Sequence, residues 1–151
     1  MGDRPMTTGE RTDPYLDFRF RVELDGLLVG GFAEVRGLEV ELETEEYEEG
    51  GLNRHAHVLP TRFRYPNLVL RRGVTDSREL WEWMARAMYG VPERKSGRIV
   101  VLDATGREAR GWAFREGYPV RWEGPELEAG RGETAIEALE IAHHGLEAYN
   151  I

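Results

Sequence analysis

Apolar and polar residues alternate along residues 15–24, the first regular segment of the chain. A period of two residues is typical of a β-strand with one buried and one solvated face. The apolar positions are Leu16, Phe18, Phe20, Val22 and Leu24. Asp25 and Gly26 follow, and this pair predicts a tight hairpin turn because both residues tolerate positive φ. The apolar residues 27–37 are the expected return strand, in which Gly30 and Gly31 predict a bulge or a close backbone approach.

The alternation resumes over residues 38–48, where glutamates alternate with apolar residues. The acidic positions at its start are Glu39, Glu41 and Glu43. This pattern predicts a third strand and allows two interpretations of its acidic face. The face is either a solvated strand surface, as most charge runs are, or an acidic wall that faces a channel or a basic partner.

A polar segment over residues 46–60 interrupts the strand pattern. Gly50 and Gly51 at its centre permit backbone angles that other residues avoid. The segment is too polar to form a core of its own, and a compact domain rarely keeps such a long excursion without a function. We therefore interpret residues 46–60 as an arm that contacts another chain.

A further strand is expected over residues 62–73, with Phe63, Tyr65, Leu68 and Leu70 as its apolar positions. Pro66 within it lacks an N–H for the strand ladder, which predicts a bulge or an edge position.

The pattern then changes to a helical period, which predicts one amphipathic helix over residues 77–89. Asp76 and Glu79 are placed to form a capping box, and Gly90 and Pro92 end the helix. Its expected buried stripe consists of Leu80, Met84, Ala87 and Met88.

Trp81 and Trp83 lie about 200° apart around this helix, so they point to different sides. At least one of them is therefore expected off the buried stripe, where an exposed tryptophan is a good interface anchor. The alternative is that both tryptophans belong to the core.

The C-terminal third predicts a second hairpin over residues 98–117, with its turn at Thr105 and Gly106, and then a loop over residues 118–125 that contains a buried Trp122. The last element, residues 132–146, is ambiguous. Its Ala, Glu and Leu content favours a helix, whereas its alternation favours a strand.

Length and composition limit the possible functions. The chain has 151 residues and no cysteine, and its formal net charge is −8. One domain over residues 15–151, preceded by a flexible tail over residues 1–14, accounts for the whole pattern. The negative charge argues against specific nucleic-acid recognition, and the N-terminus lacks the apolar centre of a signal peptide.

Candidate chemistry is sparse. None of the phosphate-binding, metalloprotease or serine-hydrolase motifs occurs, and no cofactor is expected. His55 and His57 would share a strand face and could bind a metal, but no third ligand stands at a typical spacing. His143 is expected to be a hydrogen-bonded core histidine rather than a base. The sequence therefore favours a protein that is not an enzyme.

The order of several motifs resembles a known family, the inner-tube proteins of contractile phage tails and of extracellular contractile injection systems. The resemblance runs from about Asp13 to Glu147 and is carried by DPYLDFRFRVELDG, VGGFAEVRGLEVE, EYEEGG, YPNLVLRRGVTDS, LWEW, PVRW and IEALEIAHHGLE. It implies a mainly β fold with one α-helix, an antiparallel β-sandwich or half-barrel, and it favours a strand for the last element.

The resemblance also implies how such a chain works. Six copies would close into a homohexameric ring with a shared β-barrel, and stacked rings would carry cargo through a lumen. The expected partners are further copies of the chain, a sheath protein, a baseplate or initiator protein, and a cargo effector or tape-measure protein. Assembly would take place in the cytoplasm, and the product would be a phage tail or an extracellular particle.

Particular residues acquire expected roles from this resemblance. The expected lumen-facing residues are Glu39, Glu41 and Glu43, although the strand near Glu137 is an equal alternative. The expected subunit or ring interface consists of Glu46, Tyr47, Gly50, Gly51, Asn53, Arg54, His55, Trp81 and Trp83.

Two alternatives to the main tube protein remain open. One is a tube-initiating or baseplate-adaptor paralogue of the same system. The other is a monomeric ligand-binding β-module that would use Trp81, Trp83 or Trp122 to stack on its ligand.

Overall fold

Ten β-strands and one α-helix make up the part of the chain that the computed structural model describes, residues 19–30, 32–47, 57–130, 132 and 134–150. All strand pairs in it are antiparallel, and the mainly β prediction is confirmed. The elements are β1 (Arg19–Leu24), β2 (Leu27–Val29), β3 (Phe32–Arg36), β4 (Glu41–Tyr47), β5 (His57–Arg64), β6 (Leu68–Gly73), α1 (Glu79–Tyr89), β7 (Lys95–Leu102), β8 (Glu108–Glu123), β9 (Ile136–Ala142) and β10 (Leu146–Asn150). The division between a tail and a domain at residue 15 stays a prediction, because residues 1–18 lie outside the described part.

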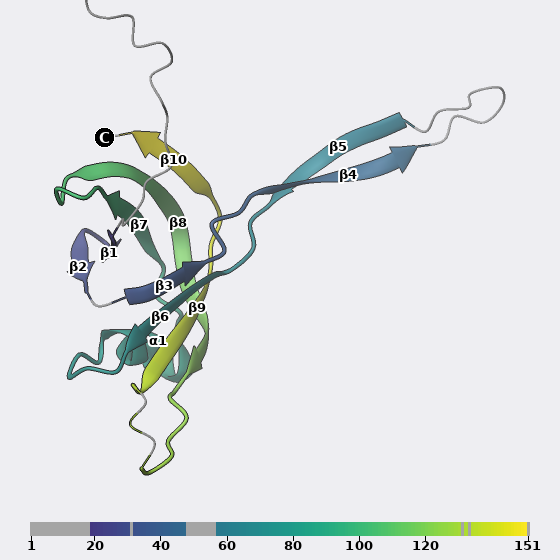
Figure 1. Cartoon of the computed structure of the whole chain (residues 1–151). Helices are drawn as coiled ribbons and strands as arrows, with labels where there is room; N and C mark the ends of the chain where they lie inside the picture. Colours follow the sequence, from purple (N-terminus) through teal and green to yellow (C-terminus); the bar gives the residue numbers. More distant parts are fainter. Residues whose placement is uncertain (1–18, 31, 48–56, 131, 133, 151) are drawn as a thin grey trace, which may run out of the picture.

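One strongly curved sheet forms the body, with the strand order β2-β1-β7-β8-β9-β6-β3 (Figure 1). The 16-residue strand β8 belongs to both halves of this sheet. Its first half pairs with β7 on one side and β10 on the other, and its second half pairs with β9. The sheet therefore curls into a half-barrel around a shared core.

The first hairpin forms as predicted. Asp25 and Gly26 both adopt positive φ, at 50° and 78°, and join β1 to β2. The single return strand expected over residues 27–37 is wrong, however. The chain leaves β2 after Val29 and crosses to the opposite end of the sheet, where β3 pairs with β6. Two strands thus stand where one was expected, and Gly31 between them lies outside the described residues.

The acidic segment and the segment after the polar excursion pair with each other as β4 and β5 (Figure 1). We call these two strands the arm hairpin. It is a separate two-stranded sheet that projects from the body. The single strand expected over residues 62–73 is in fact two strands, since Tyr65, Pro66 and Asn67 separate β5 from β6.

Two further predictions concern the C-terminal third. The hairpin β7–β8 is confirmed, and its turn is held by the Asp103 carboxylate, which accepts hydrogen bonds from the N–H groups of Thr105 and Arg107. The loop expected over residues 118–125 is wrong, because β8 continues to Glu123. Pro119 is accommodated there by a shift of register between Pro119 and Arg121.

The last ambiguous element is extended. It forms β9 and then β10, with a bend at residues 143–145 between them. Burial decides against its helix propensity, because Leu139 and Ile141 of β9 enter the core and the strand pairs with both β6 and β8.

The helix α1 is shorter than predicted and its cap differs. It begins at Glu79 after Arg78, with no side-chain cap, so the capping box at Asp76 is wrong. It packs on the core through Leu80 and Trp83, whereas Met88 of the expected stripe is 55% exposed. The core consists of Val22, Leu24, Val29, Leu68, Leu70, Leu80, Trp83, Ile99, Phe114, Leu139 and Ile141.

Candidate interaction surfaces

The two faces of the arm hairpin differ in chemistry. Glu43 is the Cα partner of Arg62, and the Arg62 Nε donates to the Glu43 carboxylate at 2.6 Å. Leu42 is the partner of Phe63, one position along, so this pair lies on the opposite face. That second face continues toward the tip with Val58, the partner of Glu46. The arm hairpin thus has one charged face and one largely apolar face.

The apolar face is open to solvent in the single chain. Phe63 is 63% exposed, Val58 is 58% exposed and Leu42 is 43% exposed. Because an isolated two-stranded hairpin is marginally stable in water, a face of this kind normally gains stability from a partner.

The predicted arm residues are only partly visible. Glu46 and Tyr47 lie near the end of β4, and both are exposed. Five others fall outside the described residues: Gly50, Gly51, Asn53, Arg54 and His55. The interface role of all seven stays a prediction.

The base of the arm hairpin is tied to the body by several contacts. Gly37 adopts φ of +93°, and a Cβ at this position would lie 2.1 Å from the Asn67 carbonyl oxygen. The Asn67 Nδ2 donates to the Glu140 carboxylate at 3.1 Å. His143 lies with its Nε2 3.2 Å from the Pro66 carbonyl oxygen. The two chain segments that enter and leave the arm hairpin therefore cross at a fixed point.

His143 is the core histidine that the sequence predicted. It is 5% exposed, and its ring contacts Tyr65 and Phe114 at centroid distances of 5.6 and 6.1 Å. Its Nδ1 lies 3.1 Å from the Gly145 carbonyl oxygen and 3.3 Å from the Gly145 nitrogen, and its Nε2 faces the Pro66 carbonyl oxygen. Burial lowers the pKa of His143, and its hydrogen bonds to backbone carbonyls partly oppose this shift.

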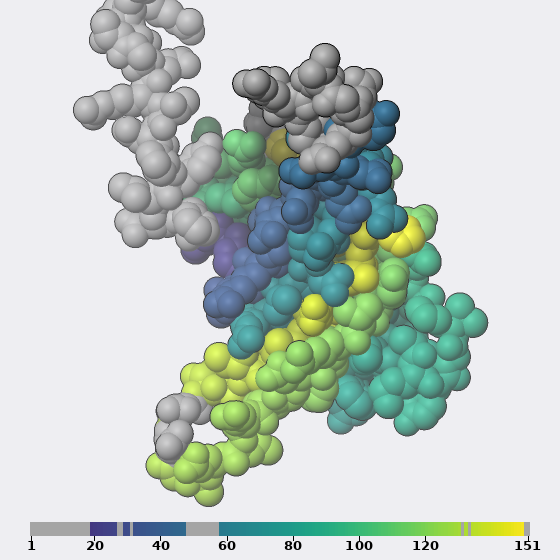
Figure 2. Space-filling view, turned by 90° about the vertical axis from the view of Figure 1, so that its right-hand side faces the viewer, coloured from purple at the N-terminus to yellow at the C-terminus, as the bar shows by residue number. Residues whose placement is uncertain are grey.

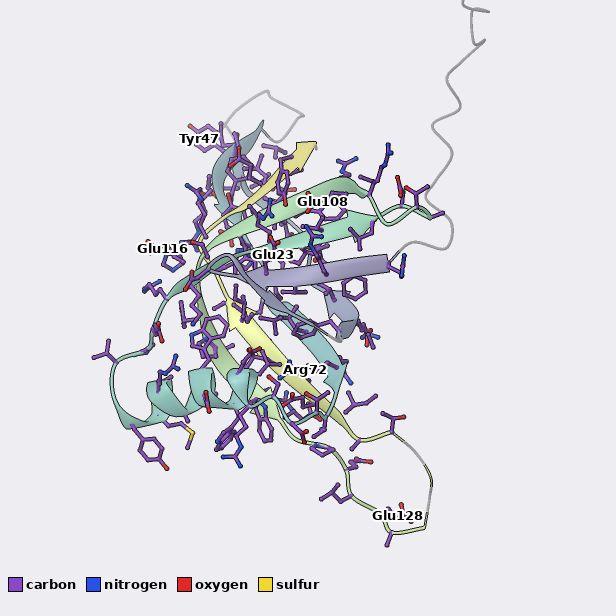
Figure 3. The ribbon with its side chains drawn as sticks, turned by 90° about the vertical axis from the view of Figure 1, so that its left-hand side faces the viewer. Glu23, Tyr47, Arg72, Glu108, Glu116 and Glu128 are labelled. Carbon is purple, nitrogen blue, oxygen red and sulfur yellow. The ribbon has the colours of Figure 1, made fainter. Side chains whose placement is uncertain are left out.

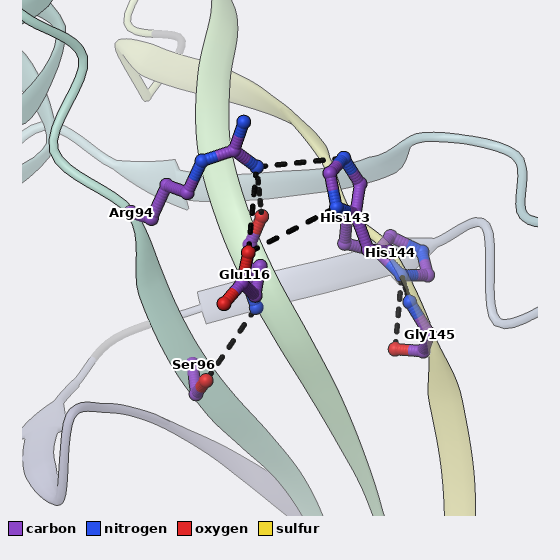
Figure 4. A network of polar contacts seen from close by, with 6 residues as sticks. All are labelled: Arg94, Ser96, Glu116, His143, His144 and Gly145. Atoms are coloured by element: carbon purple, nitrogen blue, oxygen red, sulfur yellow. Dashed lines mark hydrogen bonds and ion pairs between the residues drawn. The ribbon is translucent and has the colours of Figure 1, made fainter.

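The neighbouring polar cluster is exposed rather than buried. Figure 4 shows Arg94 close to both Glu116 and His144, beside His143. The Arg94 Nη1 lies 3.8 Å from the Glu116 carboxylate and 3.4 Å from the His144 Nε2. Within the described residues, no group of three or more His, Asp or Glu side chains is arranged to hold a metal ion.

A second candidate surface is the outer face of the four strands β3, β6, β9 and the second half of β8. Figure 2 shows these strands as adjacent diagonal bands. Its charged residues pair mainly with one another: Arg71 lies 3.7 Å from Glu34, and Arg121 lies 3.5 Å from Glu123. Among the described strands, β3 has no partner on one side, and neither has the second half of β8. This four-stranded region therefore ends in two open edges.

The two helix tryptophans separate as the 200° spacing predicted. Trp83 is 1% exposed, and its Nε1 donates to the Glu93 carbonyl at 2.7 Å. The role of Trp83 as an interface residue is therefore wrong, since its surface is already used in the core. Trp81 is 40% exposed and packs edge-on against Trp122 at 4.8 Å. Trp81 stays a predicted interface residue.

The sequence offered two acidic strands as the lining of a lumen, one near Glu41 and one near Glu137. Glu137 is 5% exposed and pairs with the buried Arg72 at 2.7 Å, so its own side chain does not face a lumen, whereas a lumen-facing position for the strand near it stays a prediction. Glu39 and Glu41 are exposed beside and within β4. Glu43 is half-buried beside Arg62. A lumen-facing position for Glu39, Glu41 and Glu43 stays a prediction.

The buried Arg72–Glu137 pair is a feature that sequence reasoning missed. Figure 3 labels Arg72 on the strands of the body, near α1. The Arg72 Nη2 lies 3.4 Å from the Ser77 carbonyl oxygen, and its guanidinium lies 5.6 Å from the Phe32 ring. The Trp122 Nε1 donates to the second oxygen of Glu137 at 3.1 Å. Arg72 and Glu137 are 65 positions apart, so no local pattern could have indicated the pair.

The body is a curved antiparallel sheet with open edges, and a two-faced hairpin projects from it. These features define an assembly subunit, a structural protein that contacts other chains through its strand edges and its arm. Among the described residues, no helix has the length and apolar character needed to cross a bilayer.

Comparison with known proteins identifies the family. The chain matches the T4-like virus tail tube protein gp19 family over residues 16–147, nearly its whole length, and it belongs to that family. It is thus a structural tube subunit. No curated protein sequence matches the chain closely enough to count as a relative.

Several solved structures share the fold at low sequence identity. A chain of the sheath–tube complex of the PVC extracellular contractile injection system superposes with a TM-score of 0.83 at 22% identity, over 93% of this chain and 95% of the other. A chain of the anti-feeding prophage tube-terminating cap superposes with a TM-score of 0.85 at 22% identity, over 100% of both chains. Hcp1 from Flavobacterium johnsoniae superposes with a TM-score of 0.60 at 20% identity, over 87% of this chain and 94% of the other.

Proposed function

We propose that this chain is the main tube subunit of an extracellular contractile particle, and that six copies close edge to edge into rings that stack around a lumen. Membership of the tail tube family carries the tube function. The observation that carries the ring is the pair of open edges, at β3 and at the second half of β8, on opposite sides of one four-stranded region.

Edge pairing between copies follows from the chemistry of a strand edge. An open edge presents unpaired N–H and C=O groups, which a strand of another chain can satisfy. Joining β3 of one copy to β8 of the next is a head-to-tail contact, and such contacts generate a closed ring when the rotation between copies closes. The remaining edges, β2 and β10, lie in the other half of the body.

The direction of curvature follows from the shape of the body. The core, the helix α1 and the β1–β7 half of the sheet all lie on the inner, core-facing side of the four strands. When the edges of neighbouring copies join, the core, α1 and the β1–β7 half of the sheet fit only on the outside of the ring. The outer face of the four strands then turns toward the lumen. The lumen would then be lined by the paired charges Glu34–Arg71 and Arg121–Glu123.

The proposed partners follow from the similar structures. One is described as a sheath–tube complex and another as a tube-terminating cap. We therefore propose that a sheath protein surrounds the ring stack, that baseplate and cap proteins contact its ends, and that cargo or a tape-measure protein occupies the lumen. Assembly in the cytoplasm and later presence in an extracellular particle complete the proposal.

A second candidate is a paralogue that starts or ends the tube. The fold likeness to chains from a cap and from a baseplate, the latter with a TM-score of 0.74 at 20% identity, favours it. A terminal paralogue would form single rings and would not stack further, whereas a main tube subunit would form stacks.

Size-exclusion chromatography with light scattering, followed by negative-stain microscopy of each peak, tests the proposal. The main tube function predicts six-fold rings and their stacks at high protein concentration. Single rings that never stack would favour the terminal paralogue. Monomers alone, at every concentration and also after co-expression with the baseplate proteins, would contradict both and favour a ligand-binding module.

A further inference from the structure

The buried Arg72–Glu137 pair belongs to a row of side chains that crosses the four-stranded region from one open edge to the other. The strand register places Phe32 of β3 beside Arg72 of β6, and Arg72 beside Glu137 of β9. The row ends on β8 with Trp122, whose Nε1 donates to Glu137. We call Phe32, Arg72, Glu137 and Trp122 the buried row, because all four face the core. Each of the four strands thus contributes one member.

The members of the buried row are joined by directional contacts. The Arg72 Nε and the Trp122 Nε1 donate to the two oxygens of Glu137 at 2.7 and 3.1 Å, and the Arg72 guanidinium lies 5.6 Å from the centre of the Phe32 ring. Such contacts need a defined distance and direction. The other core-facing residues of the same strands are mainly aliphatic, and apolar contacts are not directional. The buried row therefore resists a change in the angle between neighbouring strands more than the rest of the core does.

The buried row also connects the four strands to the helix. The Arg72 Nη2 lies 3.4 Å from the carbonyl oxygen of Ser77, two residues before α1 begins. Trp122 packs edge-on against Trp81 of α1, with 4.8 Å between the ring centres. The start of α1 and one end of the four-stranded region are therefore held as one unit.

Ring closure demands a precise curvature of the four-stranded region. Copies that close a ring share a full turn equally, which gives about 72° per copy for five, about 60° for six and about 51° for seven. Rings of neighbouring size thus differ by only about 10° per copy. Spread over the three steps between β3, β6, β9 and β8, that difference is about 3° per step. The angle between neighbouring strands varies over about 10–35° among sheets, so ladder hydrogen bonds alone leave the ring size open.

Stability alone does not account for an ion pair buried at this place. Replacing such a pair with apolar residues of similar volume is often neutral or stabilising, because the pair must first lose its water. A fully hydrogen-bonded polar network does, however, favour one arrangement of the elements that it joins. Arg72 and Glu137 are 2% and 5% exposed in the single chain, so their side chains do not themselves form a contact between copies. Any effect that they have on assembly must therefore act through the shape of the subunit.

We infer that the buried row fixes the curvature of the four-stranded region and thereby sets the number of copies that close a ring. This inference rests on the proposed function, because only a ring makes the curvature visible as a copy number. It adds the residues that determine the ring size. Arg72 and Glu137 are thus positioning residues, which act through the strands that they hold.

Counting the copies in assembled rings tests the inference. The original chain is compared with the double variant Arg72→Met with Glu137→Leu, which replaces the pair by apolar side chains of similar size and leaves both open edges unchanged. The matched control is Ile141→Val, which removes one carbon from the core toward the far end of β9. Native mass spectrometry gives the copy number of each ring, and end-on views in negative-stain microscopy check it.

The original chain and Ile141→Val are expected to form rings of one copy number. The double variant is expected to form a mixture of ring sizes and open arcs, in which the share of the main ring size falls at least twofold. Rings of one unchanged copy number from a folded double variant would overturn the inference and leave the proposed function standing. An original chain that forms no rings under any condition would overturn both.

A measurement on the free chain separates altered curvature from a general loss of stability. Spin labels are attached through Ala33→Cys on β3 and Val120→Cys on β8, both at exposed positions of a chain that has no cysteine of its own. Electron–electron double resonance on the dilute chain reports the distribution of distances between the two edges. The double variant is expected to broaden this distribution at least twofold, whereas Ile141→Val should leave its width unchanged. Equal widths in all three chains would contradict the assignment of curvature to the buried row.

Discussion

Removing one partner of the buried Arg72–Glu137 pair should strongly destabilise the fold. The Arg72 Nε and a Glu137 oxygen are 2.7 Å apart, and the two side chains are 2% and 7% exposed. Loss of one partner leaves an uncompensated buried charge, which costs about 3–5 kcal/mol. We expect a loss in this range in the free energy of unfolding for Arg72→Met, and a smaller loss for Glu137→Gln, because the amide oxygen can still accept from Trp122 or Arg72.

The double variant Arg72→Met with Glu137→Leu distinguishes a missing charge partner from a general packing defect. Replacing both members of a buried pair with apolar residues of similar size is often close to neutral. We therefore expect the double variant to be more stable than Arg72→Met alone. The Trp122 Nε1 would lose its acceptor in this variant, and we expect a residual loss of about 1–3 kcal/mol from that group.

Urea unfolding, followed by tryptophan fluorescence at a concentration where the chain is a single species, measures these differences. With a slope of about 2 kcal/mol per molar urea, a loss of about 4 kcal/mol lowers the midpoint by about 2 M. Losses that add in the double variant would refute the reasoning, since the two residues would then act independently.

Two further predictions concern the base of the arm hairpin. Gly37→Ala should lower the free energy of unfolding, measured in urea, by about 2–5 kcal/mol, because positive φ and the clash with the Asn67 carbonyl both oppose a Cβ. The control Gly26→Ala has positive φ but nothing within 4 Å of the added Cβ, so it should lose only about 1–2 kcal/mol. Equal losses in the two variants would contradict the role of the clash. His143 has a pKa lowered by burial, so below its ordinary value of about 6.5 the unfolded state binds the proton more readily and stability falls as the pH decreases. His143→Gln should flatten the pH dependence of the unfolding midpoint between pH 7 and 5. A pH dependence that is the same in this variant and in the original chain would contradict the assignment.

Local patterns predicted the elements whose cause is local. The Asp25–Gly26 turn, the alternation of β1, the helix and its end before Gly90 all follow from residues within a few positions of one another. The two-sided placement of Trp81 and Trp83 also followed from helix geometry. Which of them is buried did not, because that depends on where the sheet lies relative to the helix.

Features set by distant residues were predicted wrongly or missed. The chain crosses the body between β2 and β3 because β3 pairs with β6, some 35 residues onward. The strand at Pro119 survives because β9 pairs beside it with a shifted register. The burial of Glu137 depends on Arg72. The arm was predicted from Gly50 and Gly51, yet its two-faced character depends on the register between β4 and β5, which a single segment does not reveal.

The continuity of β8 bears on how the subunit opens. One backbone strand forms ladder hydrogen bonds with β7 and β10 in its first half and with β9 in its second. Neither half of the sheet can separate from the other without breaking this strand's ladder, so the two halves should lose protection from amide hydrogen exchange in one event. The two halves of the body should therefore unfold together. Under a force along the tube, the contacts between copies should break before the subunit unfolds.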